Sequence, residues 1–197
     1  MALKMTEQEL RLMEEEKNEA IEKDVISLIK IINSTVGIPT EKEKDDIENL
    51  VYNSLEKSFL ITSSWIKRVY GDTFNKPSKK DLERFSYDGK ISERVRKHLT
   101  DFSKGVHAAT PELEQSYKRI LINELTRIIN TESVHITNHL MWFKLKNRAK
   151  AVSVVGGHGS NMCDCEERWG MFAASKFTDS DLPPYHPECT CSIIVEI

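Results

Sequence analysis

Four cysteines near the end of the chain are the residues whose type and spacing best suit chemistry. They form two C-x-C pairs, Cys163 with Cys165 and Cys189 with Cys191, and His186 precedes the second pair by three positions. Thiolates and imidazoles are preferred ligands of Zn²⁺, and two thiol pairs at the ends of one loop can close on a single tetrahedral ion. The pattern predicts one structural zinc per chain, with these five residues competing for its four positions.

Two other states of these thiols stay open. A disulfide from one pair to the other is geometrically feasible, whereas a bridge within a C-x-C pair is strained. The remaining alternative is a set of packed, reduced thiols. The C-x-C spacing is also tighter than the usual spacing in zinc sites, so a histidine, His186 or His158, can replace one cysteine of a pair as ligand.

Composition and charge exclude several classes of protein. The chain has 197 residues, of which 30% are charged and 39% hydrophobic, with a formal net charge of −3. These values exclude collagen-like, low-complexity and wholly disordered chains, and also a strongly basic nucleic-acid coat. The first residues lack the apolar core of a signal peptide, and no apolar run is long enough to span a membrane. We therefore expect no membrane contact and a reducing cytosolic origin, which favours a metal site over disulfides.

Positive charge is concentrated in the middle of the chain. Residues 66–104 hold 11 Lys and Arg against 6 Asp and Glu. Such a segment can contact nucleic acid, and the candidate residues are Lys79, Lys80, Arg84, Arg94, Arg96 and Lys97. The alternative interpretation, solvated helix faces, is favoured because arginine clustering and interleaved aromatic residues are both modest.

Helical patterns fill the first 150 residues. Capping boxes at Thr6 and Thr40, each with a Glu three positions later, begin two long amphipathic helices. Ser92 is expected to begin a later helix and Gly105 to end it, and Thr110 begins the last and longest one. The expected helices cover about residues 6–36, 40–70, 78–85, 92–104 and 110–147.

The character of the sequence changes at Ala151. The β-branched run AVSVV and residues 191–195 predict short strands, in a segment that is rich in Gly and Pro. The fold class is therefore mainly α, built from long helices, with a small C-terminal α+β unit that zinc stabilises. The expected parts are an N-terminal helical region (1–84), a second helical part (85–150) and a Cys/His-rich unit (151–197).

Catalytic patterns are weak. His135 and His139 are four residues apart on the last expected helix, but the HExxH order of zinc proteases is absent, so we expect a surface pair. A catalytic zinc would need an open position and a nearby acid, for which Asp164, Glu166, Glu167 and Glu188 are candidates. No complete catalytic constellation is visible, so we expect no enzyme.

Three segments together resemble the phage head morphogenesis proteins, the Mu protein F-like minor head proteins. Residues 87–95, YDGKISERV, are similar to the G-x-x-S-x-R turn and helix of that family. Thr131-Glu132 and Asn138 resemble an element of its long helix. Residues 183–191, PPYHPECTC, match its closing P-P-x-H-P-x-C-x-C motif. The resemblance covers about residues 85–197 and departs from the family at Asn130 and Thr190, where Arg is usual.

The resemblance implies a structural minor capsid protein of a tailed phage. Such a protein associates with the portal or the major capsid protein in the host cytoplasm during assembly. It then lies in the virion, at the capsid interior or portal vertex, and assists head assembly, DNA packaging or ejection. The alternative is a DNA-binding assembly factor that contacts packaged DNA through residues 66–104, and the least favoured interpretation is a zinc-dependent hydrolase.

Overall fold

The computed structural model describes the chain apart from residues 1–2, 108, 157–164 and 187–188. Over the described residues, five α-helices are followed by three short strands with 3-10 turns between them. This architecture confirms the prediction of a mainly α fold with a small C-terminal sheet. The helices are α1 (Glu7–Ser34), α2 (Glu41–Tyr70), α3 (Lys79–Arg84), α4 (Ile91–Val106) and α5 (Pro111–Leu145), and the strands are β1 (Ala151–Val155), β2 (Gly170–Ala173) and β3 (Ser192–Glu196).

The two longest early helices begin at the capping boxes that the sequence predicts. Thr6 Oγ1 accepts a hydrogen bond from the Glu9 backbone N–H at 3.2 Å, and the Glu9 carboxylate accepts one from the Thr6 N–H at 2.8 Å. The bond from the Thr6 backbone lowers the pKa of Glu9. Thr40 and Glu43 repeat this arrangement at the start of α2. Both helix starts are therefore set by residues within one turn of the cap.

Helix α4 starts one residue earlier and ends two residues later than expected. The helix begins at Ile91, and the Ser92 hydroxyl donates to the Glu48 carboxylate of α2. Gly105 lies inside the helix, which ends at Val106. A Cβ at Gly105 would come within 2.6 Å of the Tyr117 ring, so glycine is needed there because α5 approaches α4 closely.

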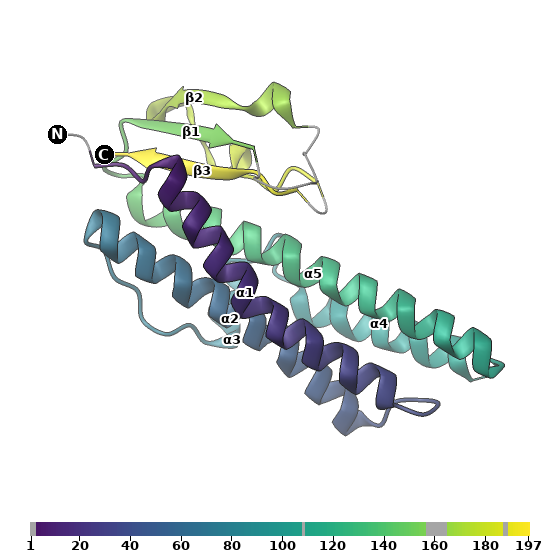
Figure 1. The fold of residues 1–197 in the computed structure, drawn as a ribbon. Coiled ribbons are helices and arrows are strands. Elements are labelled where there is room, and N and C mark those ends of the chain that lie inside the picture. The colour runs from purple at the N-terminus through teal and green to yellow at the C-terminus, as the bar shows by residue number, and fades with distance from the viewer. Residues whose placement is uncertain (1–2, 108, 157–164, 187–188) are drawn as a thin grey trace.

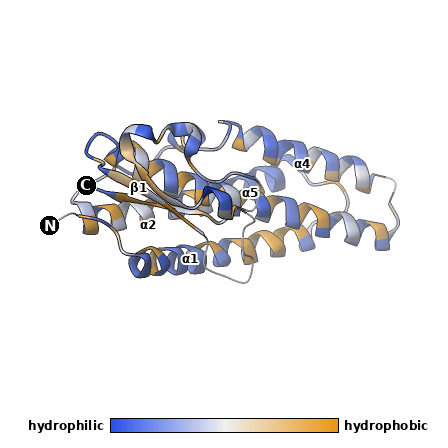
Figure 2. Ribbon diagram, turned by 90° about the horizontal axis from the view of Figure 1, so that it is seen from above, coloured by the Kyte–Doolittle hydropathy of each residue, from blue (hydrophilic) through white to orange (hydrophobic). Residues whose placement is uncertain are grey.

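Helices α1, α2 and α5 run side by side as an elongated body, and the sheet lies against one end of it, near both chain termini (Figure 1). Figure 2 shows hydrophobic and hydrophilic residues on different sides of these helices, as expected for amphipathic elements. The apolar side chains of all five helices and of the sheet join in one core. Helices from residues 1–84 therefore share a core with those from 85–150. None of the described helices has the length and apolar composition needed to cross a membrane.

The sheet is antiparallel throughout, in the order β2-β1-β3. Val152 and Val154 of β1 are fully buried, and β3 is buried from Ser192 to Val195 where it contacts α5. The chain's first described residues extend the edge of β3, because Leu3 and Ile197 exchange backbone hydrogen bonds of 3.2 and 3.0 Å. The sheet is thus held by the helical body on one side and by the N-terminal segment at its edge.

Tyr70, the last residue of α2, ties both chain ends to the helical body. Its hydroxyl donates to the Val195 carbonyl at 2.8 Å and accepts from the Met5 backbone N–H at 2.9 Å. Burial raises the pKa of this phenol. The N-terminal helix therefore folds back along the body, and the start of the chain packs beside its end.

Candidate metal centre

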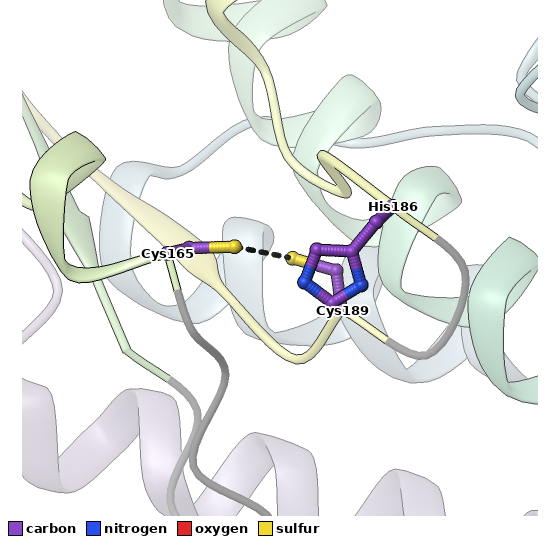
Figure 3. A group of neighbouring side chains, drawn as sticks. All are labelled: Cys165, His186 and Cys189. Carbon is purple, nitrogen blue, oxygen red and sulfur yellow. Dashed lines mark hydrogen bonds between the residues drawn. The ribbon is translucent and has the colours of Figure 1, made fainter.

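Cys165, His186 and Cys189 gather in the C-terminal unit, with their ligand atoms all within 4.8 Å of one another. The sulfur atoms of Cys165 and Cys189 face each other at 3.9 Å, and the imidazole of His186 lies beside them (Figure 3). Two thiolates on one tetrahedral ion, with metal–sulfur bonds of about 2.3 Å, lie about 3.8 Å apart. The separation of the two sulfurs therefore suits a shared metal ion.

The two sulfurs are enclosed and the imidazole is not. Cys165 and Cys189 are buried, whereas His186 is exposed. Backbone hydrogen bonds involve the peptide groups of all three residues: the Arg168 N–H donates to the Cys165 carbonyl at 2.8 Å, and the Cys189 N–H donates to the His186 carbonyl at 3.1 Å. These bonds help to fix the backbone that carries the ligands, so two thiols and an imidazole are held within reach of one ion.

A stacked pair of side chains links the two halves of the centre. The Arg168 guanidinium, three residues after Cys165, lies 4.5 Å from the centroid of the Tyr185 ring, the residue before His186. The Tyr185 hydroxyl donates to the Asp181 carbonyl at 3.0 Å. Burial, together with the nearby cysteine sulfurs, raises the pKa of Tyr185. Neither Arg168 nor Tyr185 stands out in the sequence as a functional residue, because only the folded C-terminal unit brings the two side chains together.

Asn138 of α5 connects the helical body to the loop that carries His186 and Cys189. Its side chain is fully buried, and its amide donates to the carbonyls of Pro183 and Cys191 at 3.3 and 3.0 Å. Its side-chain oxygen accepts from the Ile193 N–H at 3.0 Å. One side chain therefore holds the loop on both sides of the ligands. Partners of this kind orient metal ligands and tune affinity without touching the ion.

The structure brings together three of the five predicted ligands. Cys191 is buried next to the group, where its sulfur accepts a hydrogen bond from the Trp169 indole at 3.3 Å. Cys163 lies outside the described residues, as does the alternative ligand His158. Of the four acids proposed for a catalytic zinc, Glu167 is exposed, and Asp164 and Glu188 lie outside the described residues.

No family model, curated protein or solved structure matches this chain. The interpretation of the site therefore depends on its own residues. Two buried thiols and an exposed imidazole form a candidate metal centre, and a buried amide holds the loop that carries His186 and Cys189. Which ion suits the centre has to be judged from the chemistry of these donor atoms.

A second polar cluster lies where the turn before α4 meets α5. Glu132 is fully buried, and its carboxylate accepts hydrogen bonds from the Arg94 guanidinium and, at 2.9 Å, from the Tyr87 backbone N–H. Asp88 lies 3.4 Å from the same guanidinium. Burial raises the pKa of Glu132, and the hydrogen bond and positive charge of Arg94 oppose that rise. The pair fixes the turn and the first part of α4 against α5.

The expectation of a surface histidine pair is wrong. His135 is buried, and its ring lies 4.8 Å from that of His139, which is partly buried. Phe85 and Tyr87, from the segment before α4, cover the two rings edge-on. Burial first, and then the charges of His139 and Arg94, lower the pKa of His135 to about 4. The pair therefore belongs to the packing between α5 and the segment that precedes α4.

The six candidate nucleic-acid residues are spread over α3 and α4, and four of them contact other groups of the protein. Arg94 binds Glu132, and Arg96 binds Asp45 and Glu48 of α2. The ammonium of Lys79 lies over the Tyr52 ring, and the guanidinium of Arg84 lies over the Phe143 ring. Lys80 and Lys97 are exposed. Part of the positive charge of these six residues is therefore paired with carboxylates of the fold, and nucleic-acid binding by the set stays a prediction.

Proposed function

We propose that this chain is a structural minor capsid protein of a tailed phage, with a C-terminal unit stabilised by zinc. One observation carries the proposal: the three segments that resemble the phage head morphogenesis proteins bond directly to one another. Arg94 of the first segment binds Glu132 of the second. Asn138 of the second binds Pro183 and Cys191 of the third.

These bonds join positions that are far apart in the sequence, Arg94 with Glu132 and Asn138 with Cys191. If the three motif matches were unrelated to one another, there would be no reason for their matched polar side chains to contact each other in the fold. A buried polar group needs a hydrogen-bond partner, so a fold that depends on one residue of such a pair also needs the other residue. The resemblance thus has a physical counterpart in the fold, which supports a common role.

Zinc is the ion that the donor set favours. Two thiolates and an imidazole suit Zn²⁺, whereas carboxylate and carbonyl oxygens suit Mg²⁺ and Ca²⁺. Cys165, His186 and Cys189 would hold the ion, and Cys163 and Cys191 are the remaining predicted ligands for the fourth position. A small unit with a three-stranded sheet has little apolar core of its own, so a bound ion would supply part of its folding free energy.

The proposed role places the chain at the capsid interior or portal vertex, in contact with the portal or the major capsid protein. The test is co-expression of a tagged chain with each of these two proteins, followed by affinity purification and electron microscopy of the product. We expect at least one of them to co-purify. A Cys165→Ser/Cys189→Ser double variant separates a role for the zinc-stabilised unit from a role for the helical body. No co-purification with either partner, together with absence of the chain from purified virions, would contradict the proposal.

A further inference from the structure

A pocket of about 270 Å³ lies beside the candidate metal centre, where α4, α5 and the loop carrying His186 meet. Its size falls just below the range of about 300–1,000 Å³ typical of small-molecule sites, so it suits one small group and not a length of polymer. Its chemically active lining comes from three separate segments and consists of Tyr87, Asp88, Arg94, His98, Arg127 and His186.

Two guanidinium groups in this lining are held by carboxylates that do not line the pocket. Arg94 binds the buried Glu132, and Arg127 binds Glu124 of the same helix. In both pairs the nitrogen that donates is Nη2. A guanidinium has five N–H groups, so such a contact orients the fork and leaves other donors of the group for a ligand. Pre-orientation also lowers the entropy cost of binding.

The negative group in the lining, Asp88, is already engaged. Its carboxylate accepts from the Lys90 backbone N–H at 3.0 Å and lies 3.4 Å from the Arg94 guanidinium. Asp88 therefore offsets part of the positive charge of Arg94, and Glu124 offsets part of that of Arg127. His98 lies one turn after Arg94, with its Nε2 atom 3.8 Å from Glu124. The same Glu124 oxygen binds Arg127, so one carboxylate faces both groups. Arg127 and His98 thus offer N–H donors toward an oxyanion, and arginine can bind a phosphate through two parallel hydrogen bonds.

Tyr87 adds an aromatic surface to the pocket. Its side chain is 61% exposed, while the ring packs edge-on against the buried His135 at a centroid distance of 5.8 Å. An exposed ring that its neighbour holds in place is a stacking surface for a nucleobase. Cationic donors and an aromatic ring beside one small pocket form the combination that recognises a nucleotide, with the phosphate on the arginines and the base on the ring.

We propose that this pocket binds the phosphate group of a single nucleotide, either a free mononucleotide or the phosphorylated end of a nucleic-acid strand, through Arg127, Arg94 and His98, with the base on Tyr87. This site shares Arg94 with the nucleic-acid-binding set predicted from residues 66–104, and it differs from that set by including Arg127 of α5. It would exist whether or not the chain assembles into a capsid.

The test is calorimetric titration of the zinc-loaded, full-length chain. The probes are inorganic phosphate, deoxyadenosine monophosphate, deoxyadenosine, and a short single-stranded oligonucleotide with and without a 5′ phosphate. We expect the mononucleotide to bind and the nucleoside not to bind. Arg127→Ala should weaken the mononucleotide about tenfold or more, since a hydrogen bond to a charged group is lost. The matched control Arg119→Ala removes an exposed arginine of the same helix and should change nothing.

A second variant tests the aromatic part. Tyr87→Ala should weaken the mononucleotide about fivefold or more and leave inorganic phosphate unchanged, because only the base stacks on the ring. Preference for the 5′-phosphorylated oligonucleotide over the unphosphorylated one assigns the ligand to strand ends, and binding of the mononucleotide alone assigns it to free nucleotides. Equal binding of nucleotide and nucleoside, equal effects of Arg127→Ala and Arg119→Ala, or no binding of any phosphate probe overturns the proposal.

Discussion

The helical body and the C-terminal unit are stabilised in different ways. In the body, residues close in sequence begin and shape each helix, and the apolar faces then form the core. In the C-terminal unit, the main contacts come from distant parts of the chain: Asn138 braces the ligand loop, Tyr70 binds Val195, and the Leu3 backbone pairs with Ile197. The comparison teaches that the unit depends on contacts with the body, while the body depends mainly on its own sequence pattern.

Removal of the metal should have the largest effect and should separate the two regions. Chelation, or Cys189→Ser, is expected to abolish binding of the proposed single zinc ion and to unfold β1 to β3 locally, because structural zinc supplies much of the folding free energy of small units. Helices α2 and α5 should stay protected. Hydrogen exchange with metal analysis measures both, and Ser175→Ala, an exposed change in the same unit, is the control. Full sheet protection in a metal-free chain would contradict the zinc proposal.

Asn138→Ala should break the link between the two regions. The change leaves two buried carbonyls and one N–H without their partner, and each such loss costs about 1–3 kcal/mol, so we expect a loss of about 3 kcal/mol or more in the free energy of unfolding. Zinc affinity should fall about tenfold or more. Urea denaturation and competition with a chelator give the two numbers.

The matched control for Asn138 is Asn130→Ala, which changes an exposed asparagine of the same helix. Its effect on stability should stay within about 0.5 kcal/mol. Similar losses in both variants would show that Asn138 has no special role in holding the ligand loop.

Acidification should weaken the body through His135. Its pKa is lowered to about 4 in the folded chain, so between that value and its ordinary pKa the unfolded chain binds more protons. This contribution to stability is complete above pH 6.5 and is lost as the pH falls toward 4, with a decrease of about 2 kcal/mol from pH 7 to pH 5. Urea midpoints at the two pH values measure it.

His135→Gln should remove most of that pH dependence, since glutamine does not titrate. His107→Gln, an exposed histidine after α4, should retain it. If both variants keep the full dependence, burial of His135 is not its cause.

The smallest effect on stability should come from removing a helix cap of the body. Thr40→Ala removes the hydroxyl that accepts from the Glu43 N–H at 3.2 Å, and loss of such a cap costs about 1 kcal/mol. Thermal denaturation measures this change, and Lys42→Ala, exposed in the same turn, is the control. Zinc affinity should be the same in both variants, since α2 begins far from the ligand loop. A change in zinc affinity would mean that the two regions are coupled more tightly than the comparison implies.

Most of the helical body could be predicted from the sequence. Thr6, Thr40, Ser78 and Thr110 each precede a helix as expected, because a cap needs only the residues of the next turn. The errors occur where another helix intervenes. Gly105 fits inside α4 because Tyr117 of α5 approaches it, and Ser92 binds Glu48 of α2.

The candidate site was predictable in chemistry but not in arrangement. Cysteine and histidine spacing indicated a metal, and three of the predicted ligands do gather. The burial of His135 was not predictable, because Tyr87, which packs against its ring, belongs to a different segment of the chain. Arg127 carries no signal in the sequence either, since its place in a pocket depends on the packing of α5 against α4.

Local residue choice thus determined the helices, the two main strands and the kinds of ligand atom, because capping, periodicity and donor chemistry act over a few residues. The tertiary structure determined which ligands and which hydrogen-bonding groups come into contact. Asn138 lies about 50 residues before the loop that it braces, and Ser58 and Thr62 of α2 find their hydroxyl partners Ser133 and Thr137 on α5. Such pairs form because buried polar groups need partners, and only the packed core brings those partners within reach.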